Sequence, residues 1–422
     1  MNLLFQLGPF VLLLLAIALM PLVHGHFWER NWNKALVTLL LTTPAAVWLL
    51  VQGRPGWHAF LHALHEYVQF ILLLGTLYLV SGIVVIHGDL ASSPLGNTLW
   101  LALGAVLANV IGTTGASMLL IRPLLRANHH RKHNRHVPLF FIFVVANCGG
   151  LLSPVGDPPL LLGFLNGVDF FWTLRLWPHW LAVNGLVLLV FFLWDVQARR
   201  LDVRQGPILA IRARHPLRVE GLALGMLFVA AVTATLLLQA PAVAQRLGIK
   251  LPAWGSMGIL ALLAVLALWA VHRPGRQARV LVWEPMVEVV ILFAGIFVTM
   301  TPALMLLAAL PPAAWTPAQL LWTAGGLSGV LDNAPTYLTF ATLADPGGPA
   351  ALAAAQPKLL EALSCGAVWM GALTYIGNGP NFLIRGIAEH MGYPMPSFFG
   401  YLVYSLAVLP PIFAVATWLF FR

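Results

Sequence analysis

Long apolar runs recur from one end of this chain to the other, separated by short polar stretches. Residues 3–22 and 219–240 illustrate the pattern, because each is almost uninterrupted by charge. A helix of about 20 apolar residues crosses a hydrocarbon core of roughly 30 Å. The pattern therefore predicts an all-α polytopic membrane protein embedded in the lipid bilayer.

Composition supports this fold class and excludes several functions. Hydrophobic residues make up 60% of the 422 residues and charged residues only 9%, whereas soluble domains carry about 25% charged residues. The net charge of +9 lies mainly between the apolar runs, so we attribute it to membrane orientation and not to nucleic-acid binding. No Walker-type phosphate loop occurs. We expect a protein that is not an enzyme and has no bound cofactor.

Basic residues between the apolar runs predict the orientation, because loops rich in Lys and Arg stay on the cytoplasmic side. Four clusters occur, at 30–34, 122–135, 199–218 and 273–279. Three apolar stretches lie between the first two clusters, at 35–52, 67–87 and 97–121. Because three is odd, both clusters are cytoplasmic only if one stretch turns back. We predict a re-entrant hairpin over 97–126, with 109-NVIGTTGAS-117 at its tip.

The second half of the chain repeats this arrangement. Residues 317–344 predict a second hairpin that enters from the opposite face, with 328-SGVLDNAPTYLTF-340 around its tip. Each hairpin is followed by a helix broken by glycine and proline, at 137–166 and at 360–390. Such interruptions at matching places in two halves indicate the site of a transporter.

The two broken helices resemble each other in sequence. A shift of 221 places 150-GLLSPVGDPPLLL-162 over 371-GALTYIGNGPNFL-383, and it pairs Asp157 with Asn378. We predict two inverted-topology repeats, 1–218 and 219–422, each with five spans, a re-entrant hairpin and an interrupted helix. Because five is odd, the second repeat starts on the opposite side, and both termini are predicted outside.

Asp157 lies inside the first interruption, directly before Pro158 and Pro159. A carboxylate in the bilayer core needs a proton, a cation or a partner. A helix broken inside the membrane also exposes N–H groups that bind anions and C=O groups that bind small cations. We therefore predict that Na⁺ or a proton binds near Asp157 and Asp332.

Other oxygen-rich side chains are predicted to converge on this site, and oxygen ligands suit a hard alkali cation. The complete predicted ion- and substrate-binding set is Asp157, Asp332, Asn147, Ser153, Thr113, Thr114, Asn333, Asn378 and Asn381. Alternatives stay open for several members. The asparagines 378 and 381 could instead bond neighbouring helices, and the two threonines could cap helix ends.

Three further features carry charge. Glu288 lies one turn inside a span and is a candidate proton relay, whereas Arg385 is a candidate charge partner for either aspartate. The tract 129-HHRKHNRH-136 is interpreted as a solvated orientation loop, with pH sensing by its histidines as the alternative.

The runs 146-ANCGGLLSPVGD-157 and 328-SGVLDNAPT-336 resemble the ion transporter superfamily, most of all its NhaD-type sodium/proton antiporters. Relatives include sodium-coupled dicarboxylate symporters and arsenite efflux proteins. The resemblance implies a homodimer of inverted halves, with Asp157 and Asp332 as the membrane carboxylates and Asn147, Asn333 and Thr113 beside them. Pro158–Pro159 departs from the small hydroxyl residues expected after the aspartate.

We therefore predict a secondary transporter of the bacterial inner membrane that exchanges Na⁺ for H⁺, by an elevator-like or rocking movement. The alternative is a Na⁺-coupled symporter of citrate-like di- or tricarboxylates. A channel is disfavoured, because inverted repeats with hairpins serve alternating access.

Overall fold

Helices form almost all of the regular structure in the computed structural model, which describes residues 2–88, 90, 92–204, 216–240, 243, 246–248, 251–273, 283–312 and 314–422. The first half contains α1 (Asn2–Val23), α2 (Gly25–Trp28), α3 (Asn31–Val51), α4 (Arg54–Ile83), β1 (Val85–His87), α5 (Pro94–Asn128), α6 (His136–Val144), η1 (Cys148–Leu151), α7 (Pro158–Leu165), η2 (Phe170–Leu176) and α8 (Trp177–Arg204). The second half contains β2 (Arg218–Glu220), α9 (Leu222–Leu237), α11 (Ala253–Val271), α12 (Glu284–Ala308), α13 (Pro317–Ser328), α14 (Asn333–Ala344), α15 (Gly348–Ala355), α16 (Pro357–Met370), η3 (Gly371–Leu373), α17 (Gly379–His390) and α18 (Phe398–Phe420).

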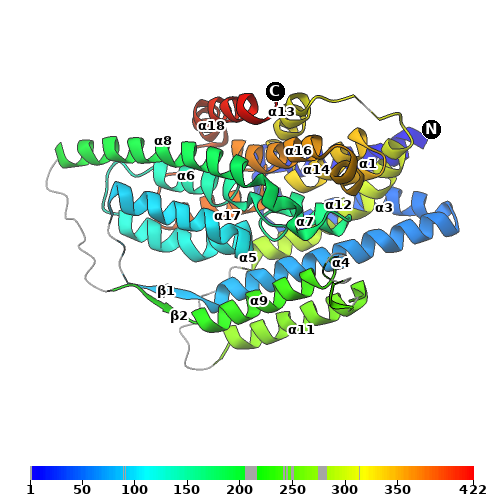
Figure 1. The fold of residues 1–422 in the computed structure, drawn as a ribbon, viewed down its shortest axis with the longest axis horizontal. Helices are drawn as coiled ribbons and strands as arrows, with labels where there is room; N and C mark the ends of the chain where they lie inside the picture. Colours follow the sequence, from blue (N-terminus) through cyan, green and yellow to red (C-terminus); the bar gives the residue numbers. More distant parts are fainter. Residues whose placement is uncertain are drawn as a thin grey trace.

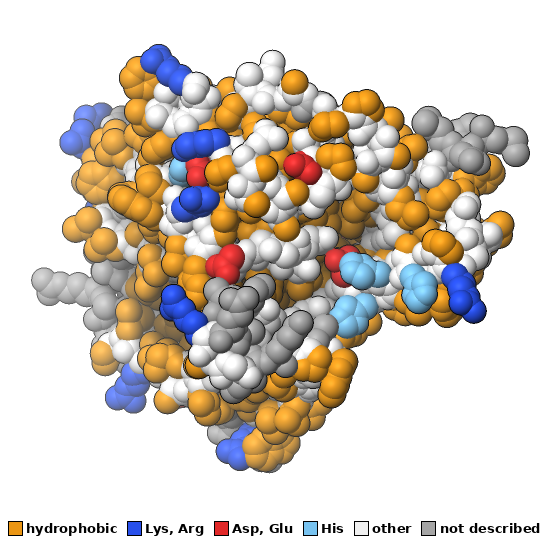
Figure 2. Space-filling model, turned by 45° about the vertical axis from the view of Figure 1, so that its right-hand side comes forward, with side chains coloured by type: hydrophobic (Ala, Val, Ile, Leu, Met, Phe, Trp, Pro, Cys, Tyr) orange, Lys and Arg blue, Asp and Glu red, His pale blue; other side chains and the backbone are white. Residues whose placement is uncertain are grey.

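The helices are apolar on their outer faces, as expected for contact with lipid. Eight helical segments among the described residues are long and apolar enough to cross a membrane. Hydrophobic side chains cover much of the surface shown in Figure 2, and charged side chains are sparse there. The prediction of an all-α polytopic membrane protein is confirmed.

One of these long segments, α5, does not run straight. The indole Nε1 of Trp100 donates a hydrogen bond to the backbone oxygen of Leu120 at 3.0 Å, although 20 residues of straight helix span about 30 Å. The chain turns at Gly112, whose φ of 76° is accessible to glycine at little cost. Residues 94–128 are therefore a helical hairpin, called the first hairpin below. Its re-entrant path through the membrane stays a prediction.

Helices α13 and α14 form a second helical hairpin, called the second hairpin below. They contact each other, and the rings of Trp315 and Phe340 meet at the open end with centroids 5.9 Å apart. Thr316 and Gln319 cap the start of α13 reciprocally, which satisfies free N–H groups there.

The helix contacts divide the molecule into two groups. Helices α1, α3, α4, α9, α11 and α12 contact one another, and the two hairpins, the broken helices, α8 and α18 form the second group. The groups meet chiefly where α4 contacts α5 and where α12 contacts α14. In Figure 1, α4, α9 and α11 lie along the lower edge, whereas α8 and α18 lie along the upper edge.

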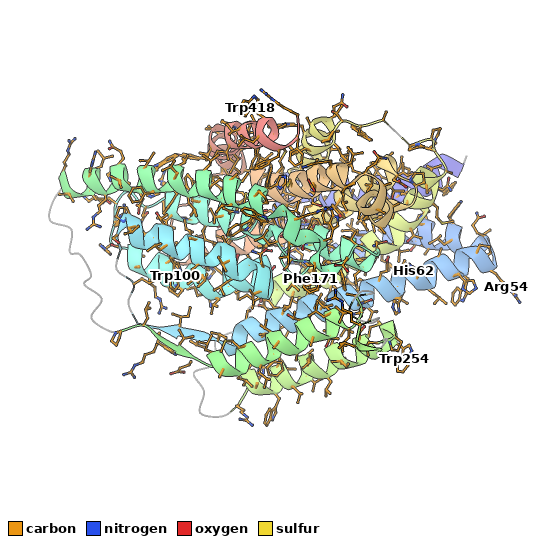
Figure 3. All side chains as sticks on the ribbon, in the orientation of Figure 1. Arg54, His62, Trp100, Phe171, Trp254 and Trp418 are labelled. Atoms are coloured by element: carbon orange, nitrogen blue, oxygen red, sulfur yellow. The ribbon has the colours of Figure 1, made fainter. Side chains whose placement is uncertain are left out.

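A short antiparallel pair, β1 with β2, joins the end of α4 to the start of α9. Arg54 and Trp254 mark the opposite end of the molecule, where α4 and α11 begin (Figure 3). The division into repeats at 218/219 stays a prediction.

The basic clusters are less loop-like than their sequence indicated. Arg122 and Arg126 lie inside α5, and Arg199, Arg200 and Arg204 lie inside α8. The stretches 205–215 and 274–282, which hold other predicted arginines, lie outside the described residues. The interpretation of 129–136 as a solvated loop is wrong for two of its residues, because Arg131 and His136 are both buried.

Candidate functional site

Both broken helices restart in the same way. Asp157 is the N-cap of α7 and Asn378 is the N-cap of α17, and both have an extended backbone. A proline follows each cap within the first helical turn. Proline suits that position because its missing N–H would have no helical partner. The two breaks therefore present an acid and an amide at equivalent helix starts.

Each break contains a close contact between two glycines. A Cβ on Gly377 would lie 2.6 Å from the backbone oxygen of Gly371, and a Cβ on Gly156 would overlap the backbone oxygen of Gly150 in the same manner. No larger residue fits either position without a shift of the backbone. The glycines of the two sequence motifs thus serve the same contact in both halves.

Each hairpin tip is fastened to one break by a hydroxyl. Ser153 Oγ donates to the backbone oxygen of Asn109 at 2.6 Å, and Thr374 Oγ1 donates to the backbone oxygen of Gly329 at 2.6 Å. Ser153, which was predicted to bind an ion, therefore holds the first hairpin tip in place.

The carboxylate of Asp157 is the centre of the site. It is 2% exposed, and it accepts hydrogen bonds from Thr113 Oγ1 at 3.0 Å, Asn378 Nδ2 at 2.9 Å and Asn333 Nδ2 at 2.7 Å. The three donors come from the first hairpin, the second broken helix and the second hairpin. All three are neutral, so they orient the carboxylate without neutralising it.

A chain of amides connects the two breaks behind Asp157. Asn378 Nδ2 donates to Asn147 Oδ1 at 3.2 Å, and Asn147 Nδ2 donates to Asn381 Oδ1 at 2.8 Å. Asn381 Nδ2 in turn donates to two backbone oxygens of the second break, those of Gly371 and Thr374. The structure thus brings the predicted asparagines 147, 378 and 381 together.

Asp332 lies at the second hairpin tip, where it caps α14. Its Oδ1 accepts from the backbone N–H of Ala334 at 3.0 Å. Beside it, the Oδ1 of Asn333 is buried and has no hydrogen-bond partner among the described residues. A buried oxygen without a donor suits a small hard cation. No preassembled cluster of three or more His, Cys, Asp or Glu ligands occurs in the described part of the chain.

A cavity of about 810 Å³ reaches this site. Thr113, Thr114, Asp157, Asp332 and Asn378 line its inner part. Its lining also includes charged and titratable residues from several helices, namely Lys34, Arg122, His390, Glu29, Glu284 and Glu288.

Two predicted residues lie away from Asp157. Glu288 forms an ion pair with Lys34 at 3.0 Å on the cavity wall. Arg385 forms an ion pair with Glu389 at 3.0 Å and lies over the ring of Tyr375, so its acidic partner among the described residues is neither aspartate. Lys34 lines the cavity as well. In the sequence it is one of the basic residues that predict orientation, and nothing local indicates that it lines a cavity.

Apolar membrane-length helices, two helical hairpins and a cavity that reaches the buried Asp157 define a multi-pass membrane protein with an internal site. Residues 2–421 match the CitMHS_2 family, whose description is "Putative citrate transport", and the chain belongs to this family. The family description points to a transporter. The match supports an ion-transporter type of protein, does not name NhaD-type antiporters, and fits the citrate-like alternative. No curated protein matches the chain.

Proposed function

We propose that this protein transports a citrate-like di- or tricarboxylate together with Na⁺, which binds at Asp157. One observation carries the proposal: a buried carboxylate with only neutral donors shares a cavity with two helix N-termini that have neutral caps. A carboxylate suits a cation, and a helix N-terminus suits an anion. The family description fits the same substrate class.

Four helix N-termini line the inner cavity. Two of them begin at an acidic residue, and two begin at a neutral residue. Asp157 caps α7 and Asp332 caps α14, so these two starts already face an acid. The limb of α5 after Gly112 and the start of α17 at Asn378 carry neutral residues. The N–H of Thr113 donates to the backbone oxygen of Gly156 at 2.9 Å, so it is the positive dipole ends of these two helix starts that favour a carboxylate.

The size of the cavity also favours an organic substrate. Its volume of about 810 Å³ lies within the range of roughly 300–1,000 Å³ that is typical of small-molecule sites. A Na⁺ ion needs far less room.

The internal sequence match supports a two-fold inverted architecture for transport. The paired glycine contacts and paired tip anchors follow the same shift of about 220 residues that relates the two motifs. The two groups of helices offer a division along which one group would slide or rock against the other. With the basic clusters on the cytoplasmic side, the part of the cavity that Lys34 and Arg122 line faces the cytoplasm in this proposal.

Exchange of Na⁺ for H⁺ is the second candidate. Asp332 shares the cavity with Asp157, and two carboxylates disfavour an anionic substrate unless cations offset them. Arg385 does not offset them, because it pairs with Glu389. Alternate binding of Na⁺ and H⁺ to Asp157 would use the same geometry.

Proteoliposomes test the proposal. We expect labelled citrate to accumulate when an inward Na⁺ gradient is imposed, and not when K⁺ replaces Na⁺. D345N is the matched control, because Asp345 is an acid whose side chain caps Gly347 in the loop after the second hairpin, and it should keep full uptake. If NaCl alone dissipates a pH gradient and citrate is never taken up, the antiporter replaces the symporter.

A further inference from the structure

A buried cluster of charges lies outside the transport cavity, where the first hairpin meets α8. The guanidinium of Arg131 contacts Asp195 Oδ1 through Nη1 at 2.6 Å and Asp202 Oδ2 through Nε at 3.2 Å. The three side chains are 1%, 0% and 4% exposed. Charges so deeply buried need mutual compensation, because each has lost its hydration.

Two histidines complete the cluster. His133 Nδ1 lies 2.7 Å from Asp202 Oδ1, and the backbone N–H of His133 donates to the same oxygen at 3.0 Å. His136 Nε2 lies 2.9 Å from Asp195 Oδ1, enclosed by the rings of Phe191 and Trp194. His133 is 38% exposed and His136 only 4%, so His133 is the one that exchanges protons readily with water.

The cluster holds both ends of the first hairpin. Asn97, near its start, donates to Asp195 Oδ2 at 2.8 Å, and Asn128, at its end, accepts from Arg131 Nη1 at 3.1 Å. The two asparagines also exchange amide hydrogen bonds at 3.0 and 2.9 Å. The base of the hairpin is thereby joined to α8 through Arg131 and its partners.

The formal charges of the cluster do not balance when both histidines are neutral. Arg131 contributes +1, and Asp195 and Asp202 contribute −2 in all, which leaves −1. Two other titratable groups face Arg131. Burial, and then the charge of Arg131, lower the pKa of His130, which favours its neutral form. Tyr393 donates its hydroxyl proton to the backbone oxygen of Leu125.

We propose that this cluster is a proton-sensitive latch: a proton on His133 balances the buried charge and fastens the first hairpin to α8, and loss of that proton loosens the contact. In this proposal the latch is therefore fastened at low pH and loosened as the pH rises.

The latch is linked to the transport site through one helical limb. The second limb of the first hairpin begins at Thr113, which donates to Asp157, and ends at Asn128, which contacts Arg131. Loosening at the base therefore changes how firmly Thr113 is held. This inference does not depend on which substrate or ion is transported.

Thermal unfolding of the purified protein in lipid nanodiscs tests the latch without any transport assay. The pH is raised from about 5.5 to about 8.5. Over this range we expect the melting temperature of the wild type to fall by roughly 2–4 °C more than that of H133Q. H133Q cannot bind the proton, and D202N removes the surplus charge, so both should lose this component. H129Q is the matched control and should keep it, because His129 in the same tract contacts the ring of Tyr393.

Hydrogen exchange of the wild type gives a second, variant-free measurement. After correction for intrinsic rates, amides in 94–104 and 120–136 should exchange faster, relative to the protein as a whole, at the higher pH. A wild-type melting temperature that falls no more than that of H133Q, a D202N variant that falls as much as the wild type, or hairpin amides whose protection does not change with pH would overturn the latch.

Discussion

The two broken helices share a backbone design and differ in one functional group. Each restarts with an extended N-cap and a proline, each contains the same glycine–glycine contact, and each accepts a hairpin tip through a hydroxyl. At the N-cap one carries the acid Asp157 and the other the amide Asn378, which donates to that acid at 2.9 Å. A nearly symmetric backbone thus surrounds an asymmetric charge.

The comparison separates what holds the site from what reacts at it. Glycines, prolines and tip anchors occur in both breaks, so they serve the architecture. The single carboxylate occurs in one break, and donors from three other segments of both halves point to it. We expect changes at Asp157 to affect transport, and changes at the anchors to affect stability.

The largest expected effect is that of D157N. Asparagine keeps the size of the side chain and removes the charge that binds a cation, so gradient-driven transport in proteoliposomes should fall at least about 10-fold, the equivalent of roughly 1.4 kcal/mol. The melting temperature should not fall, because the change removes a buried charge that has no charged partner. Unreduced transport by folded D157N would remove this residue from the mechanism.

Exchanging the two N-caps in D157N/N378D sharpens the comparison. If the backbone is equivalent on both sides, a carboxylate at position 378 faces Asn147 and the amide at position 157, and part of the transport lost in D157N should return. We expect a recovery of about 3-fold over D157N, measured as cation-dependent uptake; 3-fold corresponds to roughly 0.7 kcal/mol. The single variant N378D is the control. Its two adjacent carboxylates repel each other, so we expect a changed cation dependence and a transport rate below that of the wild type. A double variant no better than D157N would show that the two breaks are not interchangeable.

The smallest effects are expected from the anchors. S153A removes one hydrogen bond, at a cost of about 1 kcal/mol in the free energy of unfolding. T374A should cost more, about 2 kcal/mol, because Thr374 Oγ1 also accepts from the backbone N–H groups of Ile376 and Gly377. The melting temperatures of S153A and T374A are compared with that of the wild type. T374S is the control, because it keeps the hydroxyl. Equal losses for S153A and T374A would contradict the extra role of Thr374.

Much of the site was predictable because its residues stand in local motifs. Glycine, proline and one acid within thirteen residues mark a helix that cannot close, and this pattern placed Asp157, Asn378 and Asp332 in one cavity. The roles of Arg385 and Ser153 were not predictable in this way. A charge chooses its partner by distance across helices, and Arg385 found Glu389 one turn away.

The tract 129–136 shows the same limit more strongly. In sequence it is a run of histidine and basic residues, typical of a solvated loop. The burial of Arg131 depends on Asp195 and Asp202, which lie 64 and 71 residues further along the chain. Nothing local to the tract signals these partners.

By itself, the sequence determined that the chain is helical and membrane-embedded, and that two of its helices are interrupted at matching motifs. The length of an apolar run and the backbone preferences of glycine and proline are local properties. Only the tertiary structure decided that α5 bends back on itself, that Asp157 has three neutral donors, and that Arg131 is buried between two acids. Those facts depend on contacts between residues far apart in the chain, where packing and charge compensation choose among partners that composition leaves equal.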